Sequence, residues 1–143
     1  MPRDSDRPSS QTRPGTAVLV VDDDPEFRAV VGEVLSAEGC LVFEASNGRE
    51  ALRLLGHVVP DLILLDLMMP VMNGWDLYAE LQRDPRFTDT EVAVLSAVSR
   101  LRPFGHLRAL NKPIDLSILL ELLETVDSCR QGRQAAGRGI PAS

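Results

Sequence analysis

The chain has 143 residues, enough for one domain with a well-packed hydrophobic core. Its hydrophobic content of 44% and its charged content of 25% are ordinary for a soluble globular protein. The formal net charge of −6 argues against direct DNA binding, which usually needs a basic patch, and no apolar run approaches the roughly 20 residues of a membrane span.

The two ends of the chain differ in composition from its middle. Residues 1–15 are rich in proline, serine and charge, so we expect a disordered leader and not a secretory signal. Residues 129–143 show no apolar period and are expected to form a flexible tail, which leaves 16–128 as the one domain. Cys40 and Cys129 have no CxxC spacing, as is typical of reduced thiols, and we therefore place the protein in the cytoplasm.

Two continuous apolar runs predict buried parallel strands. Residues 17–21 are rich in β-branched side chains, and residues 62–65 are four aliphatic side chains in a row. Neither run alternates between polar and apolar positions, which indicates that helices cover both faces of the sheet. Shorter apolar segments predict three more strands, at 41–45, 92–95 and 108–111.

Helical patterns lie between these strands. Pro25 suits the first turn of a helix that stops near Gly39, and Asp24 is expected to be an exposed acid at its start. Its apolar spacing predicts a core face of Phe27, Val30, Val31, Val34 and Leu35. Further helices are predicted at 47–55, at 75–82, where Trp75 is expected to pack, and from 115 to 126.

The alternation of strands and helices predicts an α/β fold with a doubly wound, five-stranded parallel sheet. The connection between the fourth and fifth strands is near the minimum length for a parallel crossover, and Pro103 and Gly105 interrupt it. We therefore expect the fourth helix to be shortened to a turn or two.

Polar side chains stand at the ends of four predicted strands. Asp22 and Asp23 follow the first strand, Asp66 the third, Ser96 the fourth and Lys112 the fifth. Because the carboxyl ends of parallel strands lie at one edge of the sheet, we expect these residues to converge in one pocket. Clustered carboxylates repel one another unless a cation intervenes, and Mg²⁺ prefers oxygen ligands. Such a pocket, with an ammonium and a hydroxyl, fits transfer of a phosphoryl group to a carboxylate.

Four segments surround these strand ends: VLVVDDDPEFR at 18–28, DLILLDLMMPVMNGWDL at 61–77, VAVLSA at 92–97 and NKPID at 111–115. In this order they resemble the receiver domain of two-component response regulators, over residues 16–128. Each segment is weak evidence alone, and Asp22 or Asp23 could by itself be only a helix cap. The combination with Asp66 and Lys112 favours the receiver.

The resemblance implies a flavodoxin-like sheet with strand order 2-1-3-4-5. It implies that Asp66 accepts a phosphoryl group from a histidine kinase or a histidine phosphotransfer protein. Mg²⁺ would be held by Asp22, Asp23, Asp66 and the main-chain carbonyl of Met68. Ser96 and Lys112 would contact the phosphoryl oxygens. The protein would then be a stand-alone receiver and not a turnover enzyme, and it would signal to a downstream protein through protein–protein contacts, without binding DNA or a membrane.

Two features depart from the family pattern. Ser96 and Lys112 lie 16 positions apart, closer than is usual, and Ala109 stands where the family commonly has Tyr or Phe. Both departures fall on the family's common output face. They motivate an alternative, in which the chain is a degenerate receiver that docks independently of phosphorylation. A phosphatase of the haloacid dehalogenase type is a third possibility, but its nucleophile would follow the first strand and not the third.

Overall fold

The computed structural model describes residues 15–67, 69, 72, 74–96, 108–112 and 114–139, and at positions 96, 108, 111 and 128–139 it describes the backbone alone. Its five strands form one parallel sheet in the order β2-β1-β3-β4-β5, which confirms the predicted doubly wound, flavodoxin-like fold. Each strand begins and ends within one residue of its predicted bounds. The strands are β1 (Ala17–Val21), β2 (Leu41–Ala45), β3 (Leu62–Asp66), β4 (Glu91–Ser96) and β5 (Arg108–Asn111).

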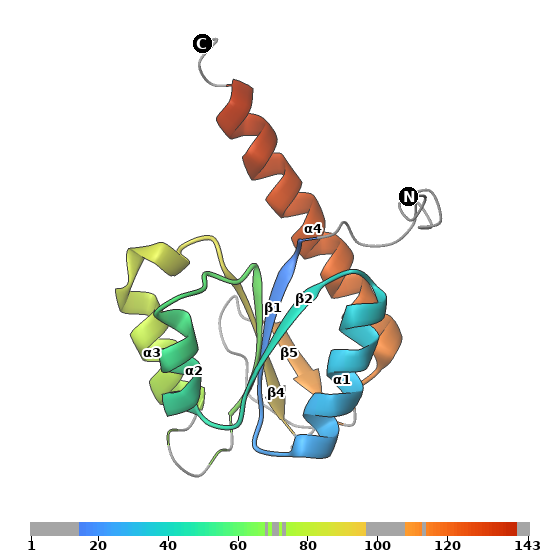
Figure 1. The fold of residues 1–143 in the computed structure, drawn as a ribbon, viewed down its shortest axis with the longest axis vertical. Coiled ribbons are helices and arrows are strands. Elements are labelled where there is room, and N and C mark those ends of the chain that lie inside the picture. The colour runs from blue at the N-terminus through green and yellow to red at the C-terminus, as the bar shows by residue number, and fades with distance from the viewer. Residues whose placement is uncertain are drawn as a thin grey trace.

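Helices cover both faces of this sheet, as Figure 1 shows: α1 and α4 lie on one side, and α2 and α3 on the other. The described residues contain four α-helices, which fits the prediction of a shortened fourth helix in this family. The position predicted for that helix, 97–107, lies outside the described residues. The helices are α1 (Pro25–Ala37), α2 (Gly48–Leu55), α3 (Gly74–Arg83) and α4 (Leu116–Gly139), with a 3₁₀ turn, η2 (Pro85–Phe87).

Alternate residues of each central strand point into two separate cores. In β3, Leu62 and Leu64 pack against α1 and α4, whereas Ile63 and Leu65 pack against α2 and α3. All four side chains are fully buried. This two-sided burial explains why the sequence of β3 has no polar alternation.

Capping side chains fix where α1 and α2, the helices before and after β2 in the chain, begin. The side chain of Asp24 accepts hydrogen bonds from the N–H groups of Glu26 and Phe27, so Asp24 is the N-cap of α1. Asn47 caps α2 by accepting from the N–H of Glu50 at 2.8 Å. The Glu50 carboxylate reaches back to the N–H and hydroxyl of Ser46, one residue before the cap.

Three expectations about the helices are wrong. Residues 129–139, assigned to a flexible tail, belong to α4, whose C-terminal part projects beyond the sheet in Figure 1. This segment contains no proline, and continuing an existing helix needs no new nucleus, so the helix extends through it despite the glycines at 132, 137 and 139. Val30 of α1 is 55% exposed and Trp75 of α3 is 46% exposed, although both were expected to pack.

Among the described residues, no helix combines the length and the apolar character that a membrane crossing demands. Cys40 is a buried free thiol. Burial, together with the charges of Glu38, Asp127 and Asp61, raises the pKa of this thiol to about 11. Cys40 therefore behaves as a core residue.

Candidate functional site

Strand register brings the predicted site residues to one edge of the sheet. Val21 pairs with Leu65, so the next residues along β1 and β3 are two aspartates, Asp22 and Asp66. At the same carboxyl edge, on the neighbouring strands β4 and β5, Ser96 pairs with Asn111, and Lys112 follows directly. Residues separated by 90 positions in the chain are thereby placed around one pocket.

Three carboxylates form the acidic part of this pocket. Asp22 is fully buried, Asp66 is 4% exposed, and Asp23 lies at the surface. One carboxylate oxygen of each lies within 4.8 Å of an oxygen of the other two. Burying two carboxylates is costly unless positive charge or hydrogen-bond donors compensate them.

The compensation comes from Lys112. Its Nζ lies 2.6 Å from Oδ2 of Asp22 and 3.6 Å from Oδ2 of Asp66. Partial burial would lower the pKa of Lys112, but the two carboxylates outweigh burial and raise that pKa above its ordinary value. Lys112 therefore stays protonated at physiological pH. Its Nζ also lies 4.6 Å from the centre of the Phe27 ring.

Asp22 accepts hydrogen bonds from two residues that follow it in the chain, Asp24 and Arg28. Its Oδ1 accepts a hydrogen bond of 2.9 Å from the N–H of Asp24. Its main-chain carbonyl accepts a hydrogen bond of 2.6 Å from Nη1 of Arg28, whose Nε lies 3.3 Å from Oε1 of Glu44. Arg28 thus ties the end of β1 to α1 and β2.

Gly74 lets the loop after β3 fold back on the strand. A Cβ at this position would lie 2.6 Å from the carbonyl oxygen of Asp66 and 2.8 Å from Cα of Leu67. The N–H of Gly74 donates to the carbonyl of Leu67 at 3.2 Å. No side chain larger than hydrogen fits between α3 and the end of β3 without backbone movement.

The structure brings Asp22, Asp23, Asp66 and Lys112 together, as the sequence predicts. Ser96 ends β4 at the same edge of the sheet, but its side chain lies outside what is described, as does the whole of Met68.

Sequence reasoning missed the site roles of Phe27, Arg28 and Gly74. Phe27 shows the spacing of a core residue, and Arg28 that of an exposed helix residue. The Asn73–Gly74 pair indicates only a turn. Each of the three contacts is therefore visible only in three dimensions.

The donor set fits a hard divalent cation. All three acidic side chains offer oxygen, the ligand type that Mg²⁺ and Ca²⁺ prefer. Oδ2 of Asp22 is buried, and Nζ of Lys112 lies 2.6 Å from it.

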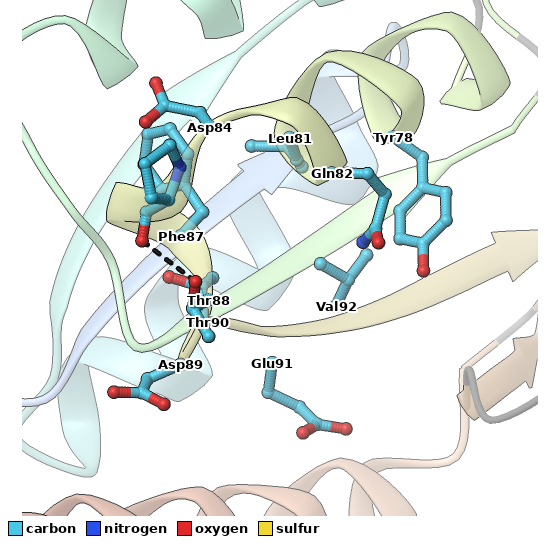
Figure 2. A pocket seen from close by; sticks show the side chains of 11 residues that line it. Tyr78, Leu81, Gln82, Asp84, Phe87, Thr88, Asp89, Thr90, Glu91 and Val92 are labelled. Atoms are coloured by element: carbon cyan, nitrogen blue, oxygen red, sulfur yellow. Dashed lines mark hydrogen bonds between the residues drawn. The ribbon is translucent and has the colours of Figure 1, made fainter.

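A separate cavity of about 440 Å³ lies at the opposite edge of the sheet, where β4 begins (Figure 2). Its walls come from the end of α3, from η2 and from the loop that follows. The acid at its rim, Asp84, is paired with Arg86 at 2.9 Å. None of the predicted site residues lines this cavity, whose lining comprises Tyr78, Leu81, Gln82, Asp84, Pro85 and residues 87–92.

Known proteins resemble this chain in sequence and in fold. The family model of the response regulator receiver domain matches residues 18–124. An uncharacterised 14.6-kDa protein of Leptolyngbya boryana is 35% identical over 121 residues, which make up 80% of this chain and 92% of that protein. The DNA-binding dual master transcriptional regulator RpaA of Synechocystis is 33% identical over 109 residues, 72% of this chain and 45% of the regulator.

Solved structures agree with the sequence relatives. The chemotaxis protein CheY4 of Vibrio cholerae aligns with a TM-score of 0.70 at 29% identity, covering 78% of this chain and 98% of that protein. The receiver domain of the Francisella response regulator 1452 aligns with a TM-score of 0.69 at 27% identity, covering 80% and 98%. The chain thus spans nearly the full length of both solved structures and less than half of RpaA.

Proposed function

Because this chain belongs to the family of response regulator receiver domains, we propose that it accepts a phosphoryl group on Asp66 from a histidine kinase or a histidine phosphotransfer protein. One observation carries the proposal. A nearly buried carboxylate at the end of the central strand lies in an acidic cluster and has an ammonium 3.6 Å away. A nucleophile, an oxygen-rich metal site and a counter-charge for an incoming phosphoryl group are thereby combined.

The transfer itself needs little covalent chemistry from the protein. A carboxylate oxygen of Asp66 attacks the phosphorus of a phosphohistidine, and a new P–O bond forms. The P–N bond breaks, and the imidazole leaves with its electron pair. The product is an acyl phosphate on Asp66. Lys112, already near Asp66, offers its ammonium to the phosphoryl oxygens, and we assign the hydroxyl of Ser96 the same task.

Asp22, Asp23 and Asp66 would hold Mg²⁺, with the main-chain carbonyl of Met68 as a further ligand. When bound, the ion neutralises charge on the phosphoryl oxygens and orients the group for in-line transfer.

The phosphorylated form would signal through protein–protein contacts in the cytoplasm. Phosphorylation adds up to about two negative charges at one edge of the sheet. Donors that gather around this charge shift the balance between two conformations of the neighbouring loops. A downstream protein would read that shift, and DNA would not be bound directly.

Intact-mass measurement after incubation with acetyl phosphate and Mg²⁺ tests the proposal. We expect the wild type to gain one phosphoryl group, and the gain to disappear with EDTA or on treatment with hydroxylamine, which cleaves acyl phosphates. Asp66→Ala should gain nothing. Asp89→Asn, an exposed acid at the opposite edge of the sheet, is the matched control and should behave as wild type. An equal gain on Asp66→Ala would refute the assignment.

One observation favours the alternative of a docking module that works without phosphorylation. Ala109 of β5 is exposed and stands where the family commonly has Tyr or Phe, so this position carries no aromatic ring. The two functions differ in one measurement. A partner captured equally well by the wild type and by Asp66→Ala, with and without acetyl phosphate, would establish docking and exclude signalling by phosphate.

A further inference from the structure

Lys112 is the only lysine in the chain, and its ammonium has three contacts among the residues that the structure describes. Two are the carboxylates of Asp22 and Asp66, and the third is the ring of Phe27, whose centre lies 4.6 Å from Nζ. We propose that Phe27 is a positioning residue, whose ring holds the Lys112 ammonium over the acidic pocket. The proposal rests on the proposed function and adds a residue to its machinery.

The distance is that of a cation–π contact. Attraction between an ammonium and an aromatic ring is significant within about 6 Å of the ring centre and grows as the ammonium loses water. The side chain of Lys112 is only 21% exposed, so its ammonium is partly desolvated. A lysine side chain has four rotatable bonds, and without a fixed partner it would sample many positions. The ring restricts Lys112 to those near the two aspartates.

Phe27 is itself fixed relative to the pocket. It lies in the first turn of α1, where its N–H donates to Oδ1 of Asp24 at 3.4 Å, and its side chain packs against the core between α1, α4 and the sheet. The N–H of Asp24 in turn donates to Oδ1 of Asp22. The contacts therefore form a closed circuit that runs from Asp22 through Asp24, Phe27 and Lys112 back to Asp22.

The ring differs from the other two contacts in one respect. Asp22 and Asp66 are also the groups proposed to bind the metal and the phosphoryl group, so their charge is shared once the site is in use. The ring is engaged by neither. Phe27 would thus keep the ammonium in place when its carboxylate partners change, and Lys112 could turn toward the phosphoryl oxygens without leaving the pocket.

Because the chain has one lysine, selective labelling isolates this contact. Protein made with ¹³C-lysine should give one side-chain Hε/Cε signal, displaced by the ring current of Phe27 from its position in free lysine. We expect Phe27→Leu to move that signal toward the free position and Phe27→Tyr to leave it near its wild-type position. Phe87→Leu is the matched control, because Phe87 lies 4.7 Å from the guanidinium carbon of Arg86, far from the pocket.

The same variants should differ in their rate of reaction with acetyl phosphate. Loss of a partly buried cation–π contact corresponds to a rate about two- to fivefold lower for Phe27→Leu. Phe27→Tyr and Phe87→Leu should both react at the wild-type rate. If Phe27→Leu does not give a folded amide spectrum, Phe27→Met replaces it, because methionine keeps the bulk without the ring.

The outcomes separate this inference from the proposed function. A Lys112 signal at the free-lysine position in the wild type, or one unchanged in Phe27→Leu, overturns the contact even if the protein is phosphorylated normally. Equal reaction rates for the wild type, Phe27→Leu and Phe27→Tyr overturn the positioning role. A wild type that takes no phosphoryl group refutes the proposed function, and the positioning role with it, while the NMR signal still decides whether the contact exists.

Discussion

Replacing Gly74 by alanine tests how closely the start of α3 is held against the end of β3, where the proposed phosphoacceptor Asp66 lies. The added Cβ would lie 2.6 Å from the carbonyl oxygen of Asp66 and 2.8 Å from Cα of Leu67. Real Cβ atoms essentially never approach other atoms within 3.0 Å. Both neighbours are backbone atoms, so no side-chain rotation relieves the clash. Either the start of α3 or the end of β3 must move.

Such overpacking typically costs about 1–3 kcal/mol. For a domain of this size, 1 kcal/mol corresponds to a change of about 4 °C in Tm, so we expect Gly74→Ala to melt about 4–12 °C below the wild type. The displaced carbonyl belongs to Asp66, whose side chain would move with it. Phosphorylation by acetyl phosphate should therefore slow as well, because nucleophile and counter-charge no longer align.

Thermal unfolding followed by circular dichroism measures the first effect, and intact mass over time measures the second. Gly56→Ala is the matched control. Gly56 follows α2 with a φ of −70°, and its nearest contact for a Cβ is the carbonyl of Arg53 at 3.3 Å. The free energy of unfolding of Gly56→Ala should stay within about 1 kcal/mol of the wild type, which is about 4 °C in Tm. A Gly74→Ala protein that matches the wild type in both assays would contradict the close approach.

Three further predictions follow from single contacts. Lys112→Met leaves the buried Asp22 and Asp66 without their counter-charge, so the free energy of unfolding in EDTA should fall by about 1–3 kcal/mol. Adding Mg²⁺ should recover part of this loss, and urea unfolding measures both changes. The N–H and hydroxyl of Ser46 hold the pKa of Glu50 below its ordinary value. This contact therefore stabilises the fold fully at pH values above the unfolded pKa of about 4.3. The stabilisation is lost as the pH falls through the lower, folded pKa. Glu50→Gln should therefore lower Tm at pH 7 and converge with the wild type in acid; parallel Tm curves would contradict this. With a pKa of about 11, Cys40 is ionised in on the order of one molecule in a thousand at pH 8. In a Cys129→Ser background, iodoacetamide should therefore label Cys40 far more slowly than free cysteine. Rapid labelling of the native protein would refute the burial of Cys40.

The sheet and its acidic pocket could be predicted from sequence because both depend on local patterns. The aliphatic run in β3 has no polar alternation, so it had to be covered on two sides, and this alone indicated a parallel sheet. In a parallel sheet the strand ends lie at one edge. The convergence of Asp22, Asp66 and Lys112 can therefore be predicted without knowing any distance.

The remaining features depend on contacts that no local pattern encodes. The spacing of Phe27 is that of a core residue, and its ring packs against the core. The same ring also faces the ammonium of Lys112, which follows β5. Val30 has the same helical spacing and is exposed, because the apolar stripe of α1 is wider than the surface that the sheet and α4 cover. The helix in 129–139 has no apolar period and includes the glycines at 132, 137 and 139, so neither pattern nor propensity predicts it.

The first turn of α1 connects these results, because three of its residues hold the pocket in different ways. Asp24 caps the helix and donates its N–H to Asp22. Phe27 faces Lys112, and Arg28 holds the main-chain carbonyl of Asp22. A rigid helical turn couples these contacts, so a movement of α1 would displace a proposed metal ligand, Asp22, and its counter-charge, Lys112, together. The position of α1 thus helps to set how the acidic pocket is charged, although α1 supplies none of the proposed metal or phosphoryl ligands.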